Sequence, residues 1–539
     1  MRMMRMHAIS RRLRDESGVT VLLALFVLTL TTLVLGAVYQ AVTNDTQGTR
    51  LNVDQSRAYA AAQAGIAQYT YQLNQNPNYW QGCHTVTNVP VPGSTDGGST
   101  EYYSYKPLPA TTAPLNDQTC DTANPGGTMI EGPGSAAPGT FRIEVTGNSK
   151  GSSANISRSI VAGFKQPSFL NYIYYTDYET LDPAALYDPS HNPAEPTDCA
   201  VHYPNRGNDC GSPIDFVTGD TINGPLHSED TIAICGAPVF GRVGYNDAVE
   251  APALSTEGQN SCPNNAVIRN SASAINSNAP SLTPPSTNSQ LLSIATANGY
   301  VYTGRTTIVL NGSTMSVTNT NPANSGPTGT AVAWPTNGVI YVSTVSSGCG
   351  VTYTPYTANA DYAGDSNCGN VYISGNYTQS LTIASDNDII INGNVTTTTT
   401  GALGTAPSGS QLLGLVANDF VRVDHPVSNR SGTTGGQCGN NATNGTGSLS
   451  GPYIYAAILA VSHSFIVDNF DCGAQLGSLT VWGAIAQLFR GPVGTIGNSG
   501  YTKDYNYDDR LAYSEPPYFL NPTSTAWYVA RSIECDNNC

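Results

Sequence analysis

Acidic and histidine side chains recur at short polar breaks between apolar runs, and they are the side chains that could carry acid/base chemistry. They are Glu229, Asp230, Asp386, Asp388, Asp419, Asp424 and His425, with His227 and His463 at the same kind of break. Paired carboxylates can act as general acid and base on a glycosidic bond. The same residue types also favour tight corners, because their side chains hydrogen-bond the local backbone. We therefore expect corner residues and no catalytic residues.

Metal and cofactor motifs are weak in this chain. Its seven histidines show no His-Glu-x-x-His spacing. The cluster of Asp504, Asp508 and Asp509 could hold calcium, but it lacks the glycine and the distal glutamate of an EF-hand loop. No Gly-x-Ser-x-Gly, P-loop or dinucleotide fingerprint appears in a suitable context. We expect no metal site and no cofactor.

Twelve cysteines form an even set, which in an exported chain predicts disulfides. Zinc is the weaker alternative, because no CxxC doublet has a matching second pair. Pairing neighbours in sequence is our hypothesis for the connectivity. The candidate pairs are Cys83–Cys120, Cys199–Cys210, Cys235–Cys262, Cys349–Cys368, Cys438–Cys472 and Cys535–Cys539.

Length and charge exclude several classes of protein. A chain of 539 residues exceeds the length at which a single compact core stops growing, so an elongated or repetitive architecture is favoured. The formal net charge of −16, without a basic cluster beyond the first residues, argues against nucleic acid as a partner. Charged residues make up only 11% of the chain, which is unlike a soluble helical enzyme.

One stretch is long and apolar enough to cross a membrane. No charge occurs from Gly18 through Asn44, which exceeds the roughly 20 residues that a spanning helix needs. Five arginines precede it, which predicts an N-terminus inside the cell and a large domain outside. The candidate membrane residues are Leu22, Leu23, Leu25, Phe26, Leu28, Leu33 and Leu35.

The start of this stretch resembles a type IV prepilin leader. A short basic segment ends at Gly18, and the apolar helix begins at Val19. In that family a prepilin peptidase cuts after the glycine, so the resemblance implies cleavage between Gly18 and Val19. The family prefers glutamate at the fifth mature position, where this chain has Leu23. The resemblance therefore implies a minor pilin, and a plain signal anchor is the alternative.

The helix is expected to continue well beyond the membrane, because the first proline is Pro77. Steps of three and four residues place five side chains on one packing face. They are Tyr59, Ala62, Ile66, Tyr69 and Leu73. The run from Arg57 to Ile66 resembles the R-x-A-x-x-A-A-E-A-G-I signature of PilX-like pilus assembly proteins, with Gln63 in place of the glutamate.

The remaining chain predicts a mainly β domain. Alternating runs at 140–145 and 157–162 indicate a hairpin. Farther on, short strands flank polar corners at 226–234, 382–391, 415–423 and 459–467. Stacking such units would form a β-solenoid with a narrow apolar core, and a β-sandwich with long loops is the alternative.

The C-terminus carries a third resemblance, to large actinobacterial pilin-like proteins. It rests on a Y-D-x-R-L motif at 507–511 followed by P-P-x-F at 516–519. Together with Trp527, these aromatics and prolines are expected to cap the last rung of the β domain.

We therefore expect four parts: a leader at 1–18, a transmembrane and assembly helix at 19–76, a disulfide-tied linker with a small β region at 77–166, and an extracellular β domain at 167–539. The predicted function is that of a minor or tip subunit of a pilus, with the membrane, other pilins, prepilin peptidase and surface carbohydrate as partners. The alternative is a membrane-anchored extracellular enzyme or binding protein that acts on polysaccharide.

Overall fold

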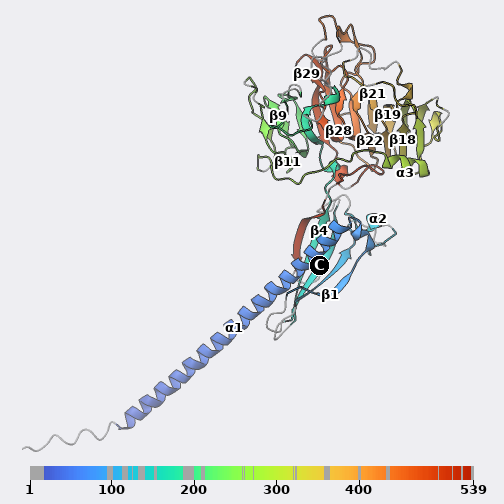
Figure 1. The fold of residues 1–539 in the computed structure, drawn as a ribbon. Helices are drawn as coiled ribbons and strands as arrows, with labels where there is room; N and C mark the ends of the chain where they lie inside the picture. The colour runs from blue at the N-terminus through green and yellow to red at the C-terminus, as the bar shows by residue number, and fades with distance from the viewer. Residues whose placement is uncertain are drawn as a thin grey trace, which may run out of the picture.

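The structure is a computed structural model, and it confirms a mainly β chain with an apolar N-terminal helix (Figure 1). It describes residues 17–535 apart from 94–100, 112–118, 124, 132–139, 151–154, 186–198, 208–209, 211–212, 258, 260, 271, 320, 322–323, 352, 357–363, 398–401, 433–437, 496, 513 and 524–525.

Helix α1 runs from Ser17 to Gln75 without interruption. Leucine and alanine are strong helix formers, and no proline breaks the run before Pro77. Its first half projects away from the rest of the molecule, whereas its second half packs on a small sheet (Figure 1). One helix therefore has a free part and a packed part.

The small sheet is antiparallel, in the order β1-β2-β3-β4-β31. Its strands are β1 (Val86–Pro90), β2 (Glu101–Leu108), β3 (Phe141–Lys150), β4 (Asn155–Lys165) and β31 (Tyr528–Cys535), with the short helix α2 (Pro125–Met129) beside them. The hairpin predicted from alternation is the β3–β4 pair, so that prediction is confirmed. The C-terminal strand β31 therefore forms one edge of a sheet whose other strands come from the N-terminal part of the chain.

The large β unit lies between β4 and β31 in the chain. Its early strands are β5 (Tyr174–Leu181), β6 (Phe216–Val217), β7 (Thr221–Asn223), β8 (Leu226–Ser228), β9 (Ile232–Cys235), β10 (Val239–Phe240), β11 (Val249–Glu250), β12 (Leu254–Ser255) and β13 (Val267–Ile268). Helix α3 (Gln290–Asn298) follows, then β14 (Tyr300–Thr303), β15 (Thr306–Gly312), β16 (Thr314–Thr318), β17 (Gly329–Val332), β18 (Val339–Ser343), β19 (Val371–Tyr377), β20 (Leu381–Ser385) and β21 (Ile389–Thr397). The late strands are β22 (Leu413–Ala417), β23 (Val421–Val423), β24 (Val427–Ser428), β25 (Thr443–Asn444), β26 (Tyr453–Ala460), β27 (Phe465–Val467), β28 (Gln475–Arg490), β29 (Gly494–Thr495) and β30 (Ser499–Tyr507).

Most strands of this unit pair in parallel with the next turn of the chain. One stack has the order β14-β18-β20-β22-β26-β28-β5-β8-β11. A second runs β15-β19-β21-β23-β27, and a third runs β28-β30-β7-β10-β13. Parallel stacking is the pairing that a β-solenoid requires, whereas sandwiches are built from antiparallel strands.

The chain enters this stack in its middle and not at an end. From β5 it proceeds to β11 at one end, crosses to α3 at the other end, and returns strand by strand to β28, which pairs with β5 (Figure 1). The crossing segment is held along the stack. Its Leu282 amide donates to Glu229, and the Asn288 side chain donates to the carbonyls of Ser385 and Val416.

Five disulfides lie in the described chain, and each joins cysteines that are neighbours in sequence. They are Cys83–Cys120, Cys199–Cys210, Cys235–Cys262, Cys349–Cys368 and Cys438–Cys472. Cys535 ends β31, and its expected partner Cys539 lies outside the described residues. Each bond closes a short loop and so limits the freedom of the unfolded chain.

The C-terminal aromatics do not form a single cap over the last rung. Trp527 lies instead in the core of the small unit, where its ring contacts Trp80 and Phe141. Its indole nitrogen donates to the Pro77 carbonyl, just past the end of α1. Tyr507 belongs to β30 inside the parallel stack, and Phe519 packs in the large core. The expectation for Trp527 was wrong, because the chain returns to the small sheet as β31 and the residue just before this strand, Trp527, packs near the end of α1.

Candidate functional site

The packed half of α1 presents a face of small residues to strand β3. Ala58, Ala61 and Ala62 are buried there, and a Cβ on Gly147 of β3 would overlap the Ala58 carbonyl and the Ala62 amide. Farther along, Ile66, Tyr69 and Leu73 are buried against the sheet. The alanine-rich run therefore lets helix and strand backbones approach closely.

Tyr59 was expected on this face, but it is 40% exposed. The close approach of Gly147 at this turn leaves room for alanine and not for a tyrosine ring. Ala58 and Ala61 take the buried positions instead. The spacing of three and four residues predicted the buried face of α1. It did not predict that this face is too narrow at the Tyr59 end for a large side chain, and Gly147 was the sequence signal for that close contact.

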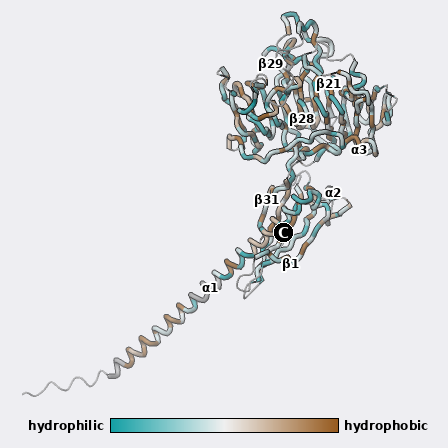
Figure 2. Tube along the Cα trace, viewed as in Figure 1, coloured by the Kyte–Doolittle hydropathy of each residue, from teal (hydrophilic) through white to brown (hydrophobic). Residues whose placement is uncertain are grey.

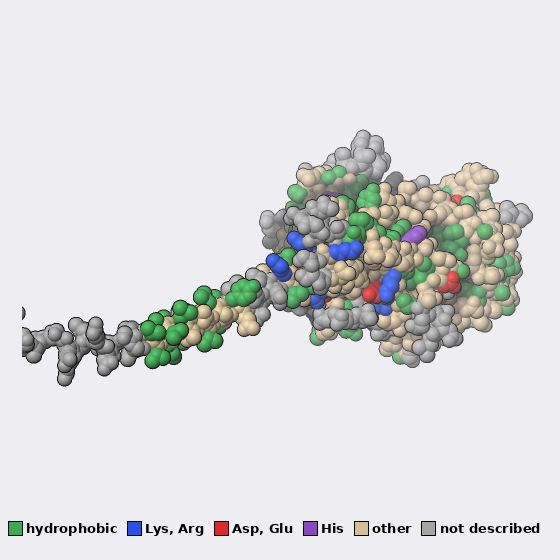
Figure 3. Space-filling model, turned by 90° about the horizontal axis from the view of Figure 1, so that it is seen from below, with side chains coloured by type: hydrophobic (Ala, Val, Ile, Leu, Met, Phe, Trp, Pro, Cys, Tyr) green, Lys and Arg blue, Asp and Glu red, His purple; other side chains and the backbone are tan. Residues whose placement is uncertain are grey.

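The free half of α1 is apolar on every side. Within the described chain, Val21–Gln40 is the helix segment long and apolar enough to cross a membrane, with a mean hydropathy of 2.6. None of it is buried. Its hydrophobic residues are brown in Figure 2, and its green side chains stand clear of the rest of the molecule in Figure 3. The predicted membrane residues Leu22, Leu23, Leu25, Phe26, Leu28, Leu33 and Leu35 are all exposed. Such a surface needs a cover, either lipid or protein.

The implied cleavage point lies at the start of this helix. Gly18 and Val19 have helical backbone within α1, and their side chains lie outside the described set. The leader arginines precede residue 17 and are also outside it.

Several of the predicted corner residues stack on one another along the large unit. The Asp419 amide donates to the Asn387 carbonyl, and the Ser462 amide donates to the Asn418 carbonyl. His463 Nδ1 lies 3.0 Å from Asp182 Oδ2, and its Nε2 lies 3.9 Å from Asp419 Oδ1. Three corners that are far apart in sequence thus share one edge, and sequence reasoning missed Asp182.

The edge has a buried polar layer beneath it. Asp182 also accepts from the Ser464 hydroxyl, and Asp386 accepts from the Tyr341 hydroxyl and the Thr344 amide. Burial lowers the pKa of His463, but the hydrogen bond to Asp182 and the negative charges of Asp182, Asp419 and Asp388 together outweigh that effect, so the pKa lies above its ordinary value. These carboxylates are engaged in holding corners together.

A second cluster surrounds His227 in β8. Its Nδ1 lies 2.8 Å from Glu250 Oε2, and its Nε2 lies 2.9 Å from Glu229 Oε1. Burial opposes protonation, but the hydrogen bonds to both carboxylates raise the pKa of His227 to about 9. Tyr172 donates to the same Glu250 oxygen. The cluster is a charged clamp between neighbouring turns of the stack.

Three more of the predicted corner residues also form hydrogen bonds or ion pairs within the protein. Asp230 pairs with Arg206, and Asp388 lies 3.5 Å from the buried Arg422. His425 is buried, contacting the Asp468 carbonyl and the Asn444 side chain. These contacts favour a structural role for each of them.

Metal-binding geometry is poor among the described residues. Asp504, Asp508 and Asp509 do not converge, because they bind Thr480, Arg510 and Arg242 respectively. Asp215, Cys235 and Cys262 do lie together, but the two sulfurs form a disulfide. A disulfide sulfur cannot serve as a thiolate ligand.

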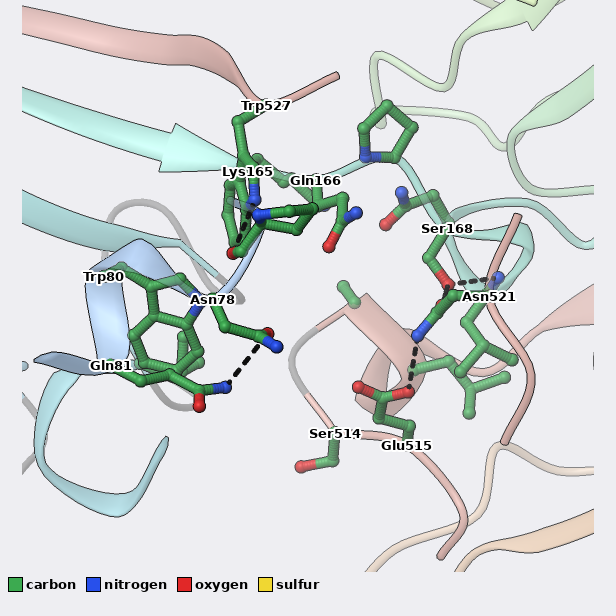
Figure 4. A pocket seen from close by; sticks show the side chains of 17 residues that line it. Asn78, Trp80, Gln81, Lys165, Gln166, Ser168, Ser514, Glu515, Asn521 and Trp527 are labelled. Atoms are coloured by element: carbon green, nitrogen blue, oxygen red, sulfur yellow. Dashed lines mark hydrogen bonds between the residues drawn. The ribbon is translucent and has the colours of Figure 1, made fainter. Parts of the chain in front are cut away.

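A cavity of about 350 Å³ lies where the small and large units meet (Figure 4). Amide and hydroxyl side chains line it, together with the indoles of Trp80 and Trp527. On one side of the cavity the Ser168 hydroxyl donates to Asn521, and burial lowers the pKa of the lining Lys165 (Figure 4). Glu515 also lines the cavity, and burial raises its pKa, so the pocket combines neutral polar side chains, one amine, one carboxyl group and two indole rings.

Comparisons with known proteins give little further guidance. No family model matches the chain, and no curated protein matches its sequence. Among solved structures, the chain is similar to the crystal structure of the competence-associated pilin ComZ from Thermus thermophilus. The sequences are 11% identical, the match covers 89% of this chain and 97% of that one, and the TM-score is 0.27. Such a low TM-score leaves the function to be argued from this chain's own features.

Proposed function

We propose that this chain is a pilin-like subunit of a type IV pilus or a related filament. The supporting observation is the division of α1, whose apolar half is bare while its second half packs on an antiparallel sheet. A bare apolar helix can rest in the membrane before assembly and against the same helix of other subunits afterwards. The sheet then places the rest of the chain at the filament surface.

In this proposal the leader is cut by a prepilin peptidase between Gly18 and Val19, as in PilX-like proteins. Before assembly the N-terminus lies on the cytoplasmic side and the β units lie outside, following the arginine-rich start. The large unit between β4 and β31 is far bulkier than the sheet that carries it (Figure 1). Such bulk would crowd a repeating lattice, which favours a minor or tip position.

Sequencing the N-terminus of the exported protein tests the cleavage. We expect Val19 as the first residue, and a variant with Gly18→Leu should keep its leader. A wild-type protein that begins at Met1 would reduce α1 to an ordinary signal anchor. The abundance of the chain in purified filaments then tests its position, because a minor or tip subunit should be sparse relative to the main pilin.

For the large unit we propose adhesion or subunit contact in place of catalysis. The cavity between the units has the chemistry to bind a neutral saccharide. Its amide side chains can form hydrogen bonds with sugar hydroxyl groups, and its indole rings can pack against the flat apolar face of a sugar ring. Glycan-array binding by wild type and by Asn78→Ala, which changes the lining, tests this. Equal glycan binding by the wild type and by Asn78→Ala would show that any saccharide site lies outside this cavity.

The enzyme alternative makes a different prediction for the stacked corners. If the chain cleaved polysaccharide, Asp386→Asn, Asp419→Asn or His463→Gln would abolish cleavage while the fold stayed intact. We expect no cleavage by wild type. Loss of a measurable activity in these variants would overturn the structural proposal.

A further inference from the structure

Lys503 and Asp220 form a buried pair inside the large unit. Alternate residues of β30 point inward, so Lys503 lies between the buried Tyr501 and Tyr505. Its Nζ is 2.9 Å from Asp220 Oδ2, and both residues are at least nine-tenths buried. A primary amine and a carboxyl group therefore touch in a site that is closed off from solvent.

The backbone fixes the carboxyl group in this position. The Val217 amide donates to Asp220 Oδ2 at 3.0 Å, and the Lys503 amide donates to Oδ1 at 3.1 Å. The Phe216 ring covers the amine, with its centroid 5.4 Å from Nζ. Neither reactive group can turn away without breaking these contacts.

The surroundings disfavour the charged form of the amine. Burial, with help from the nearby Arg490, lowers the pKa of Lys503 despite the attraction of Asp220. Arg490 itself is held by Glu179 at 2.7 Å, and its guanidinium carbon lies 3.8 Å from the centroid of the same Phe216 ring. A buried ion pair carries a desolvation cost that its mutual attraction does not always repay. A reaction that removes both charges would relieve that cost.

We propose that Lys503 and Asp220 condense to an isopeptide bond. A proton passes from the ammonium to the carboxylate, and the free amine attacks Cγ of Asp220. The Nζ–Cγ bond forms, the Cγ–Oδ2 bond breaks, and Oδ2 leaves as water with two protons from the original ammonium. The step balances without an oxidant, a cofactor or an added reagent.

Such a bond would close the large unit into a ring. Strands β7 to β29 lie between the two residues in the chain, and Lys503 sits next to the β30–β7 pairing where the late strands meet the early ones. The bond would therefore lock the seam at which the stack is completed. That would suit a unit exposed to mechanical load or proteases, and it does not depend on whether the chain assembles into a filament.

Mass spectrometry of the full chain tests the proposal. Relative to Lys503→Arg from the same host, and after allowing for the substitution, the wild-type mass should be lower by one water molecule. A digest should contain one branched peptide that joins Lys503 to Asp220. On a reducing denaturing gel, wild type should also migrate faster than the variant.

A pair with an exposed amine provides the matched control. Lys106 Nζ also lies 2.9 Å from a carboxylate, that of Glu144, but the Lys106 side chain is 57% exposed. The peptides that carry Lys106 and Glu144 should remain unlinked. A wild-type digest in which Lys503 and Asp220 are also unlinked would overturn the proposal and leave a buried salt bridge only. This result can be read from wild type alone, even if Lys503→Arg fails to fold.

Discussion

Gly147 of β3 lies directly against the backbone of Ala58 in α1. No side chain separates the strand from the helix at this point, and a Cβ on Gly147 would overlap main-chain atoms that cannot move independently. This contact fixes how far the helix can approach the sheet. It also couples the membrane-length part of the chain to the rest of the molecule.

Gly147→Ala should destabilise the small unit by about 1–3 kcal/mol, the usual cost of overpacking a core. The measurement is thermal unfolding of the detergent-solubilised chain. Gly163→Ala in the adjacent strand β4 is the matched control, because its nearest heavy atom outside the local chain is 3.7 Å from the added Cβ. Equal effects from the two substitutions would contradict the close-approach account.

The charged clamp around His227 predicts a pH dependence of stability. The folded-state pKa of about 9 lies above the ordinary value of 6.5, so the stabilisation is fully present below pH 6.5 and is lost as the pH rises through 9. The difference corresponds to about 3 kcal/mol. Urea unfolding of wild type and His227→Gln across this range measures it.

The two carboxylates of the clamp act at the acid side. Burial raises the pKa values of Glu229 and Glu250, but the hydrogen bond to His227, the charge of His227 and the further hydrogen bonds that each carboxylate accepts together lower them below the ordinary value. Their contribution is present above the ordinary pKa of 4.5 and is lost as the pH falls through the folded value. A stability difference between wild type and His227→Gln that stays flat from pH 6.5 to 9 would argue against a charged histidine.

Asp182 is expected to matter more for folding than Asp419 does, although both face His463. Asp182 is fully buried and accepts from His463, Ser464 and the Ala184 amide. Asp182→Asn should cost about 3–5 kcal/mol, as expected when one partner of a buried pair is removed. Asp419→Asn should cost under about 1 kcal/mol, because its side chain is 36% exposed. Urea unfolding midpoints of the two variants test this order.

Charges placed in the bare half of α1 should release the chain from membranes. Each arginine at the centre of a spanning helix costs about 3 kcal/mol on insertion. The double variant Leu28→Arg/Leu33→Arg should therefore shift from the membrane pellet to the soluble fraction. Tyr71→Arg, at an exposed position on the packed half of the same helix, should not. Equal membrane retention of the wild type, the double variant and Tyr71→Arg would argue against a spanning role for α1.

Local patterns in the sequence were sufficient for several of the elements. The absence of charge and proline predicts one long helix, alternation predicts the β3–β4 hairpin, and polar breaks predict the corners that end β20, β22 and β26. These features depend on residues close together in the chain, where backbone geometry restricts the possible conformations. The expectation for Tyr59 was wrong because the width of a packing face depends on its partner, here Gly147.

Only the tertiary structure decided which distant segments meet. It pairs β28 with β5, returns β31 to the sheet begun by β1, and brings Lys503 to Asp220 and His463 to Asp182. Many strands of similar apolar pattern could pair with one another, so periodicity alone does not choose among them. The pairing depends on the whole stack, because each inner strand must form hydrogen bonds and pack its side chains with the strands on both sides.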